Sequence, residues 1–209
     1  MDYKPADFFV GVMDFFTILL PGALLTFVLR DVGTPVFGAA LPALNTAAEK
    51  WIAFIVSSYI LGHLLHHLGS VLDYFYDWLY VKKWRRRHGK EDLLVKSQEL
   101  MANQLGWVRM PSVFSWAASF VRANNDTAAG ELERSGADSK FFRSLTIVLL
   151  AGGAIMWSRV GWYGALACFA LMLVSFWRFC DRRWQTSQLT YEYFIMLNLP
   201  SAKKSSAKA

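Results

Sequence analysis

Four long runs of apolar residues alternate with more polar segments along the chain and predict its main helices. The runs cover residues 8–29, 51–80, 141–158 and 160–178. Each is long enough, or nearly so, to cross a hydrocarbon core about 30 Å thick as a helix rising about 1.5 Å per residue. We therefore expect an all-α membrane protein with four transmembrane helices in two hairpins, residues 1–81 and 141–178.

A more polar segment of about sixty residues, 82–140, separates the two predicted hairpins. Apolar residues recur at helical spacing in Glu91–Leu105 and in Ser112–Ala123, so each predicts a short amphipathic helix. Asp126 follows as a candidate N-cap for the next helix. Because the segment is too small for a large core of its own, we expect a helical cytoplasmic insertion that lies on the membrane surface or against the bundle.

Two segments follow the fourth apolar run. Residues 179–199 keep a helical pattern and predict a cytoplasmic extension of the fourth helix. Residues 200–209 are rich in Lys, Ser and Ala and contain too few apolar side chains to pack, so we expect a disordered tail.

Composition supports the membrane class. The chain has 209 residues, of which 55% are hydrophobic and only 18% charged, and it contains 16 Phe, 9 Trp and 8 Tyr. A soluble domain of this length usually carries more charge and fewer apolar residues.

The distribution of basic residues predicts the orientation. With a cytoplasmic N-terminus, the outside segments hold only Arg30, Lys50 and Arg159 of the 22 basic residues. The inside segments hold the others, including Lys82, Lys83, Arg85, Arg86 and Arg87, which together with Trp84 form one dense run. Because cytoplasmic loops are enriched in Lys and Arg, we expect a multi-pass protein of the cell inner membrane with both ends inside.

The dense basic run has two interpretations. As an anchor, it binds anionic lipid headgroups, with about 1 kcal/mol per basic residue near the surface. As a docking site, it binds nucleic acid or a nucleotide-bearing partner. We favour the anchor, because the net charge of +6 is explained by basic residues that set the orientation in the membrane. We therefore do not expect direct nucleic-acid binding.

Polar side chains within the first hairpin form the candidate site, which we call the polar stripe: Asp14, His63, His66, His67, Ser70, Asp73 and Asp77. The six members on the second helix fall within roughly a third of its circumference. In an antiparallel hairpin, Asp14 is expected at about the height of position 65. An Asp–His pair there would neutralise a charge that is costly in lipid.

Three interpretations of the polar stripe are open. The side chains could hydrogen-bond two helices together, or they could line a polar or protonatable path, since histidine titrates near neutral pH. The third is a metal-dependent enzyme, because His63, His66 and His67 match the H-x-x-H-H pattern of one histidine box in membrane desaturases and hydroxylases. Those enzymes need several boxes and the only other histidine is His88, so we expect no catalytic residue, metal or cofactor.

Four short motifs carry a resemblance: Leu20-Pro21-Gly22, Tyr59-Ile-Leu-Gly62-His63, Phe141-Phe-Arg143-Ser-Leu145, and Arg178 with Arg182-Arg183 and Tyr191-Glu-Tyr193-Phe194. With them the chain resembles small multi-spanning bacterial inner-membrane proteins, some encoded beside anti-phage defence genes such as retrons and nucleotide-signalling systems. The resemblance implies a toxic effector that stays silent until a phage cue lets it permeabilise the inner membrane. It implies no particular active-site residue.

We therefore expect a non-enzymatic membrane effector that oligomerises and perturbs the bilayer. Its expected partners are membrane lipids, further copies of itself and a regulatory partner at residues 82–140 on the cytoplasmic side. The alternatives are a structural or accessory subunit of a larger membrane complex, a small ion or proton pathway and, more remotely, a metal-dependent membrane enzyme.

Overall fold

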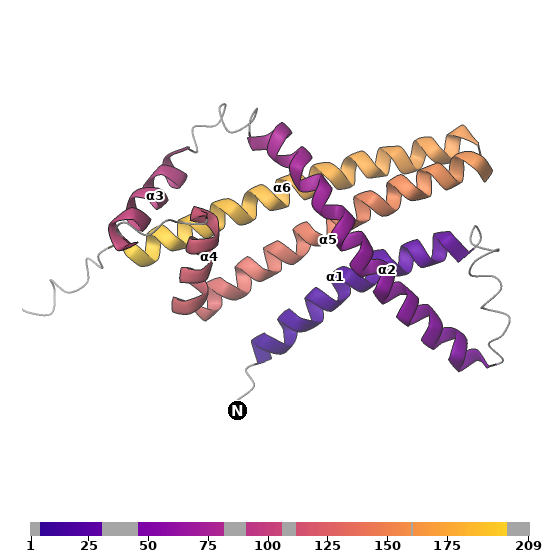
Figure 1. The fold of residues 1–209 in the computed structure, drawn as a ribbon, viewed down its shortest axis with the longest axis horizontal. Helices are drawn as coiled ribbons and strands as arrows, with labels where there is room; N and C mark the ends of the chain where they lie inside the picture. Colours follow the sequence, from indigo (N-terminus) through magenta and orange to yellow (C-terminus); the bar gives the residue numbers. More distant parts are fainter. Residues whose placement is uncertain (1–4, 31–45, 82–90, 106–111, 160, 200–209) are drawn as a thin grey trace, which may run out of the picture.

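The computed structural model describes residues 5–30, 46–81, 91–105, 112–159 and 161–199, and these segments are helical apart from short caps and turns (Figure 1). The helices are α1 (Pro5–Arg30), α2 (Ala47–Tyr76), a π-helical turn η2 (Asp77–Val81), α3 (Glu91–Leu105), α4 (Val113–Asn124), α5 (Asp126–Arg159) and α6 (Trp162–Asn198). The described residues contain no strand, so the all-α class is confirmed. The basic run Lys82–Arg87 and the tail 200–209 lie outside the described residues.

Three helices are long and apolar enough to cross a membrane, judged by length and composition: Ala47–Leu79, Asp126–Arg159 and Trp162–Asn198. In α1 the apolar stretch identified among the described residues, Phe15–Leu29, is shorter. The part of the chain that the structure describes is therefore all-helical with three helices of membrane-spanning length, while the fourth span stays a prediction.

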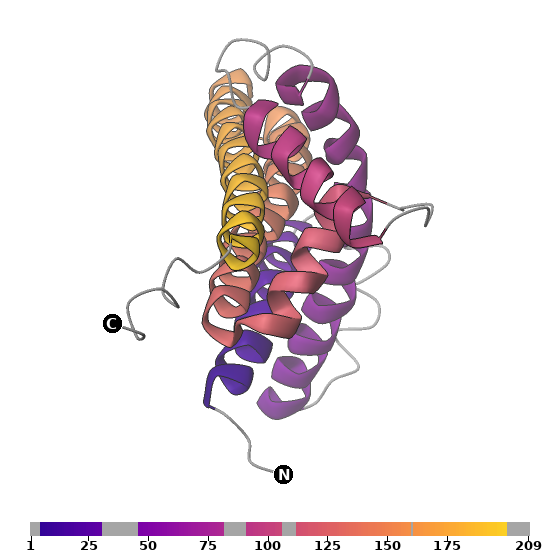
Figure 2. The ribbon, with the colours of Figure 1, turned by 90° about the vertical axis from the view of Figure 1, so that its left-hand side faces the viewer.

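The two longest helices, α5 and α6, lie side by side as an antiparallel hairpin (Figures 1 and 2). The turn between them uses Gly161 at φ 90°, a conformation that residues with a Cβ rarely adopt. Within the hairpin, the hydroxyl of Thr146 donates to Ser175 over 3.2 Å and the hydroxyl of Ser175 donates to the Phe142 carbonyl over 3.0 Å. The domain boundaries predicted at 140/141 and 178/179 both fall inside these continuous helices.

The second helix, α2, crosses this hairpin diagonally and also crosses α1 (Figure 1). Its buried residues recur every three or four positions up to Leu65 and Gly69 and define a seam: Ser58, Gly62, Leu65, Gly69 and Tyr76. Small residues on the seam let backbones approach closely. A Cβ added to Gly22 of α1 would lie 1.8 Å from the Ser58 carbonyl oxygen, and one added to Gly62 would lie 2.2 Å from that of Ile18.

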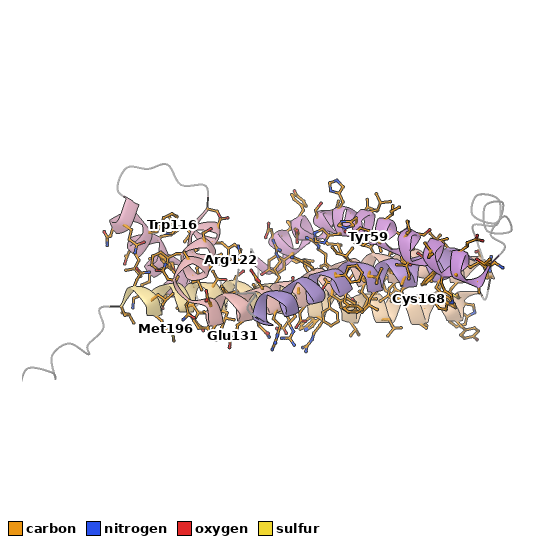
Figure 3. All side chains as sticks on the ribbon, turned by 90° about the horizontal axis from the view of Figure 1, so that it is seen from below. Tyr59, Trp116, Arg122, Glu131, Cys168 and Met196 are labelled. Carbon is orange, nitrogen blue, oxygen red and sulfur yellow. The ribbon has the colours of Figure 1, made fainter. Side chains whose placement is uncertain are left out.

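The two short helices, α3 and α4, pack against the start of α5 and the end of α6. They share one apolar cluster of buried residues: Met101, Ala117, Val121, Ala128, Leu132 and Phe194. Figure 3 places Trp116 and Arg122 at this end, near Met196 of α6 and away from Cys168. The helix predicted at Glu91–Leu105 is confirmed, and the one predicted at Ser112–Ala123 begins one residue later because Ser112 is its N-cap.

Candidate functional site

The side chains of the predicted polar stripe on α2 point in two directions, some toward the buried seam and some away from it. At 100° per residue, His66 and Asp73 border the buried seam and are half-buried against α5. His63, His67 and Ser70 lie on the side of α2 turned away from the seam, and all three are exposed. Asp77, the first residue of η2, is exposed and lines a cavity.

A buried arginine of α5 holds the inward part of the stripe. Arg143 is 8% exposed, and its Nη1 lies 2.7 Å from Oδ2 of Asp73. Its Nη2 donates to the carbonyl oxygen of His66 over 3.3 Å and lies at the same distance from both ring nitrogens of His66. Gly69 leaves room for this guanidinium, since a Cβ there would lie 2.9 Å from Nε of Arg143.

A second arginine, from α6, reaches the same carboxylate. Nη1 of Arg183 lies 3.4 Å from Oδ1 of Asp73, and its guanidinium carbon lies 5.5 Å from the centre of the Tyr76 ring. Tyr76 in turn packs edge-on against Phe179, with ring centres 5.9 Å apart. Asp73 of α2 is thus bound by α5 and by α6, and we call Asp73, Arg143 and Arg183 the charge cluster.

The charge cluster is suited to fixing helices and to attracting an anion. Two guanidiniums share one carboxylate, so the cluster keeps an excess positive charge. Ion pairs taken out of water cost desolvation energy, which good geometry and further hydrogen bonds offset. The cation–π contact with Tyr76 and the bond to the His66 carbonyl supply such interactions.

Sequence reasoning did not single out Arg143 as a site residue, although a signal was present. Arg143 is the only charged residue within the apolar run 141–158. A charge inside an apolar span usually faces the protein interior and has a partner, so its position alone favoured an internal ion pair.

The predicted pairing of Asp14 with a histidine stays a prediction, because the side chain of Asp14 lies outside the described residues. Ile18, one turn later in α1, contacts the seam at Gly62. Arg143 on α5 is a polar partner of His66 among the described residues.

The outward part of the stripe has only local contacts in the described structure. The ring of His63 lies edge-on against that of Tyr59, with centres 4.5 Å apart, and Ser70 donates to the carbonyl of His67 over 2.7 Å. Across the described residues, no group of three or more His, Cys, Asp or Glu side chains is placed to hold a metal ion.

Comparison with models of known protein families, with curated proteins and with solved structures finds no match to this chain.

Proposed function

We propose that this chain is a non-enzymatic protein of the bacterial inner membrane that self-associates and perturbs the bilayer, as an effector of an anti-phage defence system. It spans the membrane four times, with α1 as the fourth span and both ends in the cytoplasm. The observation that carries the proposal is the outward, polar side of α2 in the middle of an apolar surface.

The surface around that polar side supports membrane insertion. Large apolar side chains are exposed along α2 and into η2, from Trp51 at 66% to Trp78 at 61%. The apolar windows of the three long helices are only 17–28% buried inside the protein. Lipid tails or further protein must therefore cover them, since soluble monomers rarely expose apolar patches of this extent.

The polar side of α2 supports self-association. His63, His67 and Ser70 are exposed within this apolar surface. Ser70 donates to the His67 carbonyl, but contact with lipid tails would leave the polar ring nitrogens of the two histidines without hydrogen-bond partners, at a cost of free energy. Polar residues in spans usually face a bundle interior or a water-filled path. A second copy of the chain that covers this face would satisfy them and would place a polar strip inside the assembly.

The arrangement of the helix ends supports the proposed orientation. α5 begins and α6 ends where α3 and α4 pack, and α2 runs toward the same end (Figure 1). The insertion and the C-terminal extension therefore lie at the same end of the helices, and we propose that this end faces the cytoplasm, as the basic run predicts.

Inducible expression in bacteria with a membrane-potential dye tests the function. We expect depolarisation on strong expression, either alone or with neighbouring genes that supply the activating cue. Cells that keep their potential in both settings would contradict the proposal. A stable stoichiometric partner after mild detergent purification, with no toxicity, would instead identify an accessory subunit.

Cross-linking tests the self-association. A Ser70→Cys variant, made in a background without Cys168 and Cys180, should give cross-linked multimers in membranes with a short bifunctional maleimide. A Leu68→Cys variant is the matched control, because Leu68 is also exposed but lies about 160° away around α2. Equal cross-linking of both variants, or none, would contradict an interface on the polar side.

A further inference from the structure

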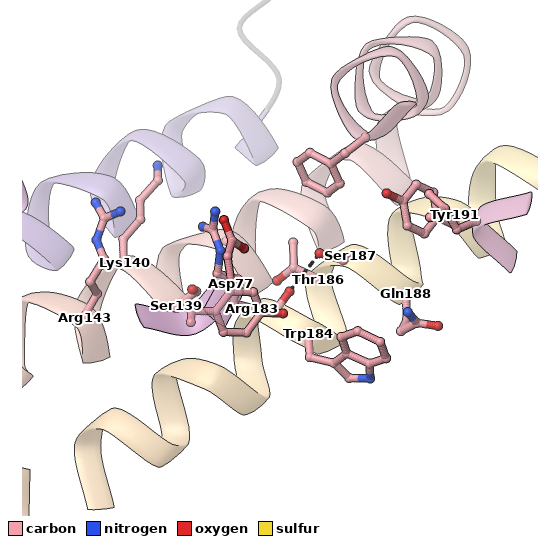
Figure 4. Close-up of a pocket in the computed structure, with 14 residues that line it drawn as sticks. Asp77, Ser139, Lys140, Arg143, Arg183, Trp184, Thr186, Ser187, Gln188 and Tyr191 are labelled. Carbon is pink, nitrogen blue, oxygen red and sulfur yellow. Dashed lines mark hydrogen bonds between the residues drawn. The ribbon is translucent and has the colours of Figure 1, made fainter. Parts of the chain in front are cut away.

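A cavity of about 380 Å³ lies where the ends of α2 and α6 meet the middle of α5, beside α3 and α4 (Figure 4). Its volume is within the range of pockets that hold small ligands. Residues from six helical elements contribute to its wall, including Asp77 of η2, Phe114 of α4 and Leu94 of α3.

The wall of the cavity is cationic on one side. Lys140, Arg143 and Arg183 line it, against the single lining carboxylate of Asp77. Figure 4 shows the nitrogen-bearing ends of these three cations on the same side of α5. With Asp73, which pairs with both arginines, the three cations stand against two carboxylates among the described residues. A partly enclosed excess charge favours an anion more strongly than the same charge in open water.

Cationic groups from two helices, α5 and α6, can bind the same oxyanion in the cavity. Arg183 carries five N–H donors, and its ion pair with Asp73 engages one nitrogen, Nη1. Lys140 approaches from α5 and is half-buried, while the buried Ser139 adds a hydroxyl to the same wall. Two cations and a hydroxyl around one space suit the several oxygens of a phosphate group, because charge-assisted hydrogen bonds to phosphate are among the stronger ones.

The position of the cavity along the spanning helices indicates which kind of molecule carries the phosphate. Tyr74 and Trp78, which flank the lining residues Tyr76 and Asp77 in sequence, are exposed at 76% and 61%. Trp177, which precedes the lining residue Arg183 in α6, is exposed at 59%. Exposed Trp and Tyr at the ends of spans mark the headgroup level of a bilayer. The cavity lies at that level, between the apolar spans and the helices α3 and α4.

We infer that this cavity is a binding site for a phosphate anion, and that an anionic phospholipid headgroup is the form its position favours. The inference is separate from the proposed perturbation of the membrane, because it concerns binding and is measured without any activity. A phosphate-bearing molecule from the cytoplasm shares the chemistry and is the other source that the experiment distinguishes.

Native mass spectrometry of the full chain in mild detergent tests the site. The probes are phosphatidylglycerol, zwitterionic phosphatidylcholine, and soluble glycerol phosphate. We expect one retained phosphatidylglycerol, and a loss of roughly tenfold or more in affinity for the double variant Lys140→Gln/Arg183→Gln. Arg134→Gln/Arg178→Gln is the matched control, since it removes two exposed arginines of α5 and α6 that do not line the cavity.

The single variant Lys140→Gln leaves the charge cluster intact and keeps the test valid if the double variant folds poorly. Its affinity for phosphatidylglycerol should also fall while the control retains the wild-type affinity. Glycerol phosphate that binds as strongly as the lipid, and is lost in the same variants, would keep the phosphate site and overturn the lipid as its source. Absence of binding for both phosphatidylglycerol and glycerol phosphate, or equal losses in the control, would overturn the site itself.

Discussion

Replacing Arg143 by Met tests whether the charge cluster fixes α2 onto the α5–α6 hairpin. The substitution keeps an apolar side chain of similar length and removes the ion pair of 2.7 Å to Asp73. Removing one partner of a buried pair typically costs about 3–5 kcal/mol. Here Asp73 keeps Arg183 at 3.4 Å and is 24% exposed, so we expect about 2–3 kcal/mol.

Thermal unfolding of the purified chain in mild detergent measures this loss. For a chain of this size, each kcal/mol lowers the midpoint by about 2–4 °C, so Arg143→Met should melt about 4–12 °C lower. Arg178→Met is the matched control, because Arg178 is 48% exposed and pairs only loosely with Asp181 at 3.6 Å. Exposed pairs of this kind contribute at most about 1 kcal/mol.

A double-mutant cycle isolates the pair itself. Asp73→Asn removes the carboxylate, and the double variant Asp73→Asn/Arg143→Met removes both charges. Because the two side chains are in contact, we expect a coupling free energy of about 1–3 kcal/mol. A coupling below about 0.5 kcal/mol, or an Arg143→Met variant that melts like Arg178→Met, would refute the view that the cluster fixes α2.

Three further substitutions test other parts of the fold. Gly22→Ala places a Cβ 1.8 Å from a backbone oxygen of α2, so it should destabilise the chain by about 1–3 kcal/mol in detergent melting. Gly152→Ala should leave the stability unchanged, because the Cβ added there meets no neighbouring atom within 4 Å. Equal melting temperatures of the two variants would contradict the close crossing of α1 and α2. Phe194→Ala removes a fully buried side chain from the apolar cluster that α3 and α4 share, and should lower the free energy of unfolding by about 3–5 kcal/mol. Proteolysis of α4 should then be faster, whereas Met196→Ala, at an exposed position, should leave the rate of proteolysis unchanged. Equal rates in the two variants would contradict a stabilising role of the cluster. Thr46→Ala removes the capping box at the start of α2 and should lower the stability of the helix by about 1 kcal/mol, measured as faster amide hydrogen exchange in its first turn. Unchanged exchange would show that the cap does not stabilise that turn.

The sequence predicts the helices well because their signals are local. The amphipathic spacing of Glu91–Leu105 corresponds to α3 from its first to its last residue. At the next helix start the pattern was one residue off: the side-chain oxygen of Asn125 accepts from the Ala128 N–H, so Asn125 is the cap in place of Asp126. Asn and Asp cap helices about equally well, and sequence alone does not decide between neighbours.

The partners within the site depend on non-local packing and were harder to predict. Counting helical rises gave Asp14 and the histidines a similar height, but height does not say which way a side chain points. That direction follows from the seam, where Gly62 and Gly69 turn one side of α2 inward. The seam brings His66 to Arg143, and only the crossing of α2 over the hairpin shows this.

Depolarisation by a variant of the outward polar side tests the central claim most directly. His63→Leu/His67→Leu makes that side of α2 apolar without touching the charge cluster, and His88→Leu makes the same chemical change outside the apolar runs. At matched abundance in the membrane, the wild-type chain and His88→Leu should collapse the membrane potential, whereas His63→Leu/His67→Leu should lose most of this effect. A double variant that depolarises cells as fast as the wild type would contradict the account.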